Sequence, residues 1–149
     1  MYLYYLFEVI MLKDPVLRTI TILMVPVIVL YGLYVQFHGD YSPGGGFQAG
    51  VIVAAAIIIY SMLFGLSITL KAISPYIVRL MGGIGVLIYG ITGIASMFFG
   101  GEFLSYSVLI DNSVVGQELG IFLVELGVGI TVCSSMLTLY FSFVSWCKE

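Results

Sequence analysis

The stretch from Phe47 to Leu70 reads FQAGVIVAAAIIIYSMLFGLSITL and contains no charged side chain. A transmembrane α-helix needs about 20 predominantly apolar residues to cross the hydrocarbon core of a bilayer, and this stretch is long enough. Inside that core the backbone N–H and C=O groups find no water, so a single segment satisfies them by forming a helix. The stretch therefore predicts a membrane-spanning helix.

Three other stretches have the same apolar character, at about residues 19–37, 80–100 and 119–144. The first two contain no charge, and the third contains only Glu125. Charged residues make up 9% of the sequence and hydrophobic residues 61%, whereas a typical soluble domain has about 25% charged residues. A water-soluble globule of this size has too much surface to cover with so few polar side chains. We therefore predict an all-α integral membrane four-helix bundle that forms one domain over residues 1–149.

The basic residues indicate how the four spans are oriented. They fall before the first span, beside the second connection and after the last span: Lys13, Arg18, Lys71, Arg79 and Lys148. All of them therefore lie on one side of the membrane, and the positive-inside rule places that side in the cytoplasm. We predict cytoplasmic N- and C-termini, with the loop at residues 38–46 on the outer side.

Residues 1–12 precede the first span and are apolar apart from Glu8. They are too few to cross a bilayer, and they lack the basic start and the cleavage site of a signal peptide. Because tyrosine prefers the headgroup level of a membrane, the three tyrosines in this segment favour a short N-terminal interfacial helix. A translation start at Met11 is the alternative, and the sequence leaves both interpretations open.

The sequence argues against several classes of function. Its five Lys and Arg residues are spread over the whole length and form no basic patch, which argues against nucleic-acid binding. The chain shows no spacing typical of a metal site, no nucleotide-binding loop and no nucleophile motif, so we expect no cofactor, no metal and no enzymatic activity. Cys133 and Cys147 lie about 21 Å apart along one regular helix, which is too far for a disulfide bond.

The segment from His38 to Gly50 reads HGDYSPGGGFQAG and leads into the second span. Ser42 followed by Pro43 is typical of a helix start, because the hydroxyl can cap free N–H groups and proline suits the first helical position. The three glycines at 44–46 cost up to about 1 kcal/mol each in a helix relative to alanine. They favour either a tight turn packed closely against another helix or a polar concavity of backbone N–H groups on an ion path.

The run GLYVQFHGDYSPGGGFQAG at residues 32–50 resembles the signature of the B subunit of Mrp-type multisubunit cation/proton antiporters. Pro26 in the first span and the sequence LKDP at residues 12–15 are similar to features of that family. Ala49 is a departure, since a glycine is common at this place. The resemblance covers about residues 11–145.

The resemblance implies a small accessory subunit of a heteromeric assembly that exchanges Na+ for H+ across the prokaryotic cytoplasmic membrane. Its partners would be the lipid bilayer and the other antiporter subunits, of which the large ones would carry the protons. Related subunits occur in membrane-bound hydrogenases and other relatives of respiratory complex I, so a scaffold subunit of such a redox-driven pump is the alternative. This chain offers no ligand set for an iron–sulfur cluster or haem, so redox chemistry would lie elsewhere.

Small residues recur at helical spacing in the last three predicted spans. In lipid such residues mark where helices meet, because close van der Waals packing replaces the hydrophobic drive. We expect packing between helices or subunits at Pro43, Gly44, Gly45, Gly46, Gly50, Gly120 and Gly127.

Glu125 is the one charged residue inside a predicted span. At about 100° per residue it lies opposite the stripe of small residues on its helix, which predicts that it points out of the subunit. An intramembrane carboxylate is costly and is functional by default. Three interpretations stay open: contact with a polar group of another subunit, a place on a cation or proton path, and snorkelling to the outer surface.

His38 and Asp40 lie together in the predicted outer loop. Imidazole has an unperturbed pKa near 6.5, so His38 can change charge under working conditions and relay a proton or collect cations with Asp40. A loop histidine hydrogen-bonded to backbone is the alternative. The candidates for an ion path are therefore Glu125, His38 and Asp40.

Overall fold

The computed structural model describes residues 14–39, 44–110 and 112–146. Within these ranges the chain is built from helices and short connections, without strands. In chain order the elements are α2 (Pro15–Phe37), α3 (Gly46–Phe64), α4 (Leu66–Ala72), α5 (Pro75–Phe98), the 3-10 helix η1 (Tyr106–Val108) and α6 (Ser113–Trp146). Four of these helices are long and apolar enough to cross a membrane, which confirms the predicted all-α class with four spans. The interfacial helix and the alternative start at Met11 concern residues that lie outside the described ranges.

Two of the long helices begin with a side-chain N-cap followed by proline. The side chain of Asp14 accepts a hydrogen bond from the N–H of Val16 at 3.0 Å, and Pro15 opens α2. Ser74 accepts from the N–H of Tyr76 at 3.3 Å in the same way before α5. A cap of this kind satisfies an N–H group that has no partner within the helix, and proline is pre-set for the first helical position.

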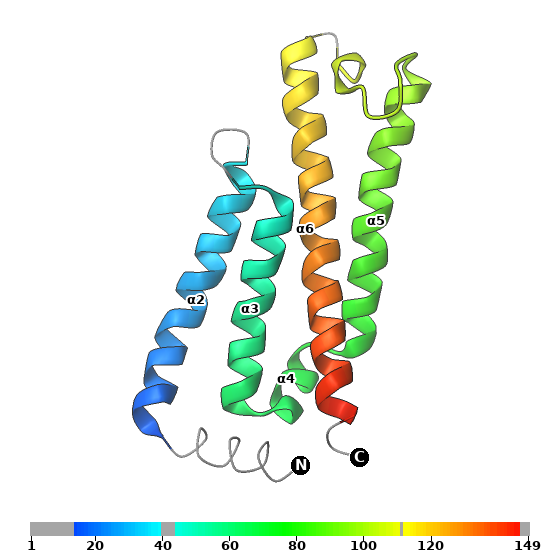
Figure 1. The fold of residues 1–149 in the computed structure, drawn as a ribbon. Helices are drawn as coiled ribbons and strands as arrows, with labels where there is room; N and C mark the ends of the chain where they lie inside the picture. Colours follow the sequence, from blue (N-terminus) through cyan, green and yellow to red (C-terminus); the bar gives the residue numbers. More distant parts are fainter. Residues whose placement is uncertain (1–13, 40–43, 111, 147–149) are drawn as a thin grey trace.

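The four long helices lie side by side in the order α2, α3, α6, α5 (Figure 1). α6 packs extensively against both α5 and α3, whereas α2 packs mainly against α3. Gly127 of α6 faces α5, and Gly129 of α6 faces α3 and α2. At about 100° per residue these two glycines lie on nearly opposite sides of the helix. α6 is therefore covered on two faces.

The structure differs from the uninterrupted helix predicted for residues 47–70. α3 ends at Phe64, and α4 begins after Gly65, whose backbone has φ of 90° and ψ of 145°. This positive φ is easily adopted by glycine alone, because other residues carry a Cβ that clashes. The N–H of Gly65 donates to the carbonyl of Ser61 at 3.0 Å, and this bond closes α3. α4 then lies at the end of the bundle where α2 starts and α6 finishes, here called the α4 end (Figure 1).

The buried apolar core lies toward the α4 end. It joins residues of α3, α4, α5 and α6, namely Ala54, Leu66, Val78, Leu137, Phe141 and Val144. Beside it the hydroxyl of Tyr140 on α6 donates to the hydroxyl oxygen of Ser61 on α3 at 3.2 Å. Ser61 is only 2% exposed, so this hydrogen bond links the two central helices in a region with little water.

At the opposite end, here called the η1 end, a loop connects α5 to α6. Ser96 is fully buried there, and its hydroxyl oxygen accepts a hydrogen bond from the N–H of Leu104 at 3.0 Å. The same hydroxyl lies 2.8 Å from the carbonyl oxygen of Gly93 and 3.1 Å from that of Glu102. Leu104 has φ of 66°, which is an uncommon conformation for leucine. Ser96 therefore holds the loop against α5.

α6 is longer than the span predicted for residues 119–144. Its 34 residues extend for about 51 Å at 1.5 Å per residue, whereas the hydrocarbon core of a bilayer is about 30 Å thick. Figure 1 shows that α5 and α6 reach beyond the end of α2 and the start of α3 at the η1 end.

Candidate functional site: the glycine loop and Glu125

His38 ends α2 and is held by the last turn of that helix. Its backbone N–H donates to the carbonyl of Tyr34 at 3.1 Å, and its ring Nδ1 lies 3.1 Å from the same oxygen. The imidazole also stacks on the ring of Tyr34, with the ring centroids 4.2 Å apart. A carbonyl oxygen accepts only, so Nδ1 carries a proton in this contact.

The carboxylate of Glu125 on α6 lies against the backbone of the loop between α2 and α3. A Cβ atom on Gly39 would overlap the carboxylate, and a Cβ on Gly45 would lie 2.8 Å from its Oε1 atom. Gly46 meets the main chain of the same residue, since a Cβ there would overlap the carbonyl oxygen of Glu125. Glycine at these three positions is what allows the loop to approach α6 so closely.

The prediction that Glu125 points out of the subunit is therefore wrong. The side chain is half-buried and faces the glycines of its own chain. The helical wheel assigned a single buried face to α6, along the stripe of small residues that includes Gly127. α6 in fact has two covered faces, and Glu125 lies on the second one, toward α3.

The predicted helix start at Ser42-Pro43 also differs from the structure. α3 begins at Gly46, with Gly45 as its N-cap in an extended conformation and without a side-chain cap. The first N–H groups of a helix lack partners within it and carry partial positive charge, which favours a nearby anion. The Glu125 carboxyl group lies at this end of α3, beside Gly45. Pro43 itself lies outside the described residues.

Glycines also make the contacts of α6 farther along both covered faces. On the α3 side, a Cβ on Gly50 would lie 2.5 Å from the carbonyl oxygen of Gly129. On the α5 side, a Cβ on Gly127 would lie 2.8 Å from the carbonyl oxygen of Gly85. Gly120 packs against the ring of Tyr106 in η1, and burial raises the pKa of that phenol above its ordinary value. By contrast, Gly44 meets only side-chain atoms, those of Gln48 and Val35.

The structure thus brings Glu125 next to the loop that His38 begins. Asp40, the third candidate for an ion path, lies outside the described residues. Among the residues that are described, no group of three or more His, Cys, Asp and Glu side chains is placed to hold a metal ion.

One polar residue of this region was missed by the sequence analysis. Gln36 lies in α2, two residues before His38, and is 91% buried with 9% of its surface exposed. Its amide nitrogen Nε2 has no hydrogen-bond partner. A carboxamide in an otherwise apolar span was the available signal, because such a group needs a partner once water is excluded.

Comparison with known proteins identifies the family. Residues 16–138 match the family described as "Domain related to MnhB subunit of Na+/H+ antiporter". Proteins of Staphylococcus aureus strains Newman, JH1 and Mu3, each named "Putative antiporter subunit mnhB2", are 38% identical to this chain over 134 residues. The match covers 83% of this chain and 94% of each relative. The chain therefore belongs to the family of the MnhB subunit of Na+/H+ antiporters.

Proposed function

We propose that this chain is an accessory subunit of a multisubunit Na+/H+ antiporter in the prokaryotic cytoplasmic membrane. Its relatives carry the name of an antiporter subunit, and the family description refers to a Na+/H+ antiporter. The four apolar helices suit a multi-pass subunit that assembles with others in the bilayer. These names favour a transporter subunit over an enzyme, and they do not favour the hydrogenase scaffold.

Within this role we assign Glu125, together with His38 and Asp40, to the ion path of the complex. The observation that carries this assignment is the position of the Glu125 carboxylate against the backbone of Gly39 and Gly45. A carboxylate at the junction of a loop and two spans can take up a proton or a cation from the water side. His38, one residue before Gly39, adds an exposed imidazole, the side chain that proteins use most often for acid–base chemistry.

The proposal includes the orientation that the basic residues predict. With both termini in the cytoplasm, the loop between α2 and α3 faces the outer side, where the complex meets extracellular Na+. Glu125 lies at the same end of the bundle. The negative charge of this region would then attract cations to the mouth of the path.

The test uses Na+-driven pH change in everted membrane vesicles that contain equal amounts of assembled complex. Glu125→Gln keeps the size and most of the hydrogen-bonding capacity but removes the charge, so we expect at least a tenfold loss of exchange and an altered pH dependence. Glu118→Gln is the matched control, because Glu118 is an exposed acid two turns away on the same helix. Full exchange with an unchanged pH profile in Glu125→Gln would remove this residue from the ion path and leave it a packing role.

A further inference from the structure

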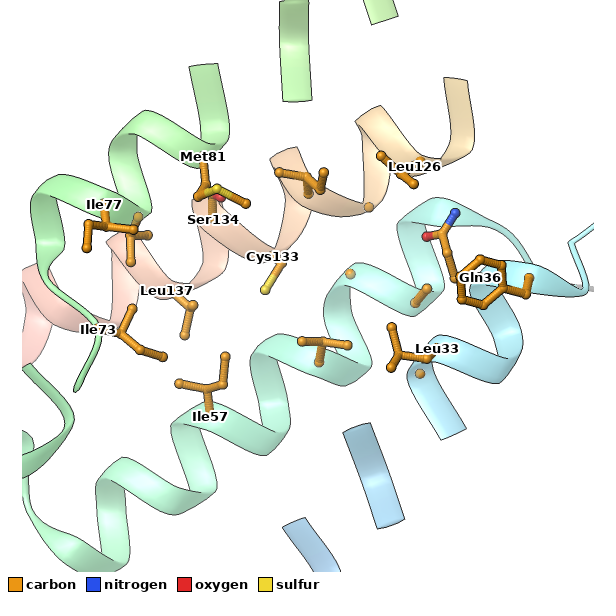
Figure 2. A pocket seen from close by; sticks show the side chains of 18 residues that line it. Leu33, Gln36, Ile57, Ile73, Ile77, Met81, Leu126, Cys133, Ser134 and Leu137 are labelled. Atoms are coloured by element: carbon orange, nitrogen blue, oxygen red, sulfur yellow. The ribbon is translucent and has the colours of Figure 1, made fainter. Parts of the chain in front are cut away.

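Two pockets of the bundle differ in what they are able to recognise. A groove of about 350 Å³ lies between α2, α3, α5 and α6, and Figure 2 shows it lined mostly by apolar side chains, such as Leu33, Ile57 and Leu137. The hydrophobic effect has no direction, so an apolar wall of this kind does not select one occupant over another. A second pocket, of about 250 Å³, lies at the α4 end between α4, α5 and α6, and it contains an arginine.

Three helices line this second pocket. On each of them the lining residues are spaced mostly three or four apart, which places them on one face of the helix. α4 contributes Leu66 and Leu70, α5 contributes Pro75 and Arg79, and α6 contributes Thr138, Phe141, Ser142 and Ser145. The pocket therefore combines an apolar part with a polar part made of one guanidinium and three hydroxyls.

Arg79 brings positive charge to a part of the structure that has little to balance it. Among the described residues, the α4 end carries three basic side chains, Arg18, Lys71 and Arg79, and one acid, Asp14. The carboxylate of Asp14 caps the start of α2. The N-terminus of α5, where Pro75 lines the same pocket, adds the partial positive charge of a helix start. The charges around the pocket therefore favour an anion.

The polar groups of the pocket differ in what they can donate. The hydroxyls of Thr138 and Ser142 each donate to a carbonyl of their own helix at 2.8 Å. The hydroxyl of Ser145 makes no hydrogen bond within the described part of the chain, so its proton is available. The guanidinium of Arg79 presents N–H groups in a planar fork that matches two oxygens of a phosphate. Arg79 and Ser145 are thus the donors that an anion in the pocket can use.

The depth of the pocket in the membrane indicates which anion it meets. Tyr76 of α5 is 67% exposed and directly follows Pro75, and Trp146 of α6 is 75% exposed and directly follows Ser145. Exposed tyrosine and tryptophan are enriched at the boundary between hydrocarbon and headgroups. After Arg79, α5 continues to its end without another charged residue, so Arg79 lies where the apolar span begins. The pocket therefore lies at the level of the lipid headgroups.

We propose that this pocket binds the phosphate group of an anionic phospholipid such as phosphatidylglycerol, and that Arg79 and Ser145 donate hydrogen bonds to its oxygens. The glycerol backbone and the first methylene groups of an acyl chain then lie against Leu66, Leu70 and Phe141. A zwitterionic lipid fits less well, because none of the described residues that line the pocket is a carboxylate that could receive its ammonium group. Such a site depends neither on the ion path nor on which side of the membrane the α4 end faces.

The experiment uses the assembled complex, purified in mild detergent and mixed with a phosphatidylglycerol that carries a diazirine near the ester end of one acyl chain. After irradiation, mass spectrometry locates the adducts, which we expect on Leu66, Leu70 or Phe141. A phosphatidylethanolamine with the same probe should give about fivefold fewer adducts there, the fold-change that corresponds to about 1 kcal/mol for one basic residue near a charged membrane surface. Excess unlabelled phosphatidylglycerol should remove the adducts, whereas glycerol phosphate at the same concentration should not, because it lacks an acyl chain.

Two variants separate a specific site from general attraction to charge. Arg79→Gln removes the charged donor, so phosphatidylglycerol should then label the pocket about as weakly as phosphatidylethanolamine does. Lys71→Gln is the matched control, because Lys71 is exposed at the same end and does not line the pocket, and it should keep the fivefold difference. Equal losses in the two variants would overturn the proposal, as would equal labelling by both lipids in the unmodified chain.

Two other occupants are covered by the same experiment. Removal of the adducts by glycerol phosphate would show a site for soluble phosphate compounds, and an absence of pocket adducts would show no lipid site; either result would overturn the proposal. A carboxylate of the complex is detected with Arg79→Lys, because a water-soluble carbodiimide joins an amine to a carboxylate that lies against it. A cross-link from position 79 to such a carboxylate would show an acidic side chain in the place of the lipid and would also overturn the proposal.

Discussion

Gly46 of α3 and Glu125 of α6 are in direct backbone contact. A Cβ atom on Gly46 would overlap the carbonyl oxygen of Glu125 and would lie 2.7 Å from its carbonyl carbon. The obstacle is main chain of a packed helix, so it cannot move aside as a flexible side chain can.

This contact makes Gly46→Ala strongly destabilising. Overpacking of a well-packed contact costs about 1–3 kcal/mol, and here the added methyl group meets backbone. Gly83→Ala is the control, since a Cβ at Gly83 of α5 meets nothing within 4 Å. We expect a lower melting temperature or lost co-purification of partner subunits for Gly46→Ala, and an unchanged or raised melting temperature for Gly83→Ala, measured on the detergent-purified complex. Equal behaviour of the two variants would contradict the close approach of α3 to α6.

Ser96→Ala should loosen the loop at the η1 end. It removes the acceptor of the Leu104 N–H, and a buried donor without a partner costs about 1–3 kcal/mol. We expect faster hydrogen exchange of amides at residues 101–105, with little change in the middle of α6. Ser135→Ala is the control, because Ser135 is exposed and donates only to a carbonyl of its own helix. Unchanged exchange of the loop amides in Ser96→Ala would refute the anchoring role.

Tyr140→Phe should destabilise the contact between α3 and α6 by about 0.5–1.5 kcal/mol, because it removes the hydrogen bond to Ser61. The measurement is resistance of the purified complex to thermal unfolding. Tyr76→Phe should have no effect, since Tyr76 is exposed at the start of α5. In a double-mutant cycle, Ser61→Ala should remove most of the effect of Tyr140→Phe. Additive effects of the two substitutions would show that the hydroxyls do not interact.

The orientation of the chain can be tested with single introduced cysteines in a background that carries both Cys133→Ala and Cys147→Ser. Ala72 and Glu102 are exposed at the α4 end and the η1 end, respectively. With both termini in the cytoplasm, an impermeant thiol reagent added to intact cells should label Glu102→Cys, and it should label Ala72→Cys only after the membrane is opened. Labelling of Ala72→Cys in intact cells would reverse the proposed topology.

The four spans could be predicted from sequence because a chain segment in the lipid core must satisfy its own backbone hydrogen bonds. A long stretch without charge has to form a helix, and residues 19–37 and 80–100 lie almost entirely within α2 and α5. The break at Gly65 was missed because the residues on both sides of it are equally apolar. A hydropathy profile therefore does not change at this position and cannot show where the helix ends. Only the backbone conformation distinguishes Gly65 from the glycines that lie inside helices.

The position of Glu125 could not be predicted from one helix alone. A wheel ranks the faces of α6 by residue size, and it favoured the face of Gly127. The second face carries Glu125 as well as Gly129, and it is covered because α3 supplies Gly46 and Gly50 as matching gaps. The fit between these glycines and the backbone of α6 depends on how the two helices pack, so it cannot be read from the sequence of α6 alone.

The central position of α6 has a consequence for how the protein is made. α2 and α3 can pair as soon as both have left the ribosome, since they contact each other directly. α5 packs mainly on α6 and contacts α2 and α3 little, so on insertion it has no extensive partner among the helices made before it. α6 follows α5 in the chain. Because α6 packs on both α3 and α5, its insertion brings the α2–α3 hairpin and α5 into one bundle. Until α6 has been inserted, the α2–α3 hairpin and α5 are therefore connected by the chain but share no extensive contact surface.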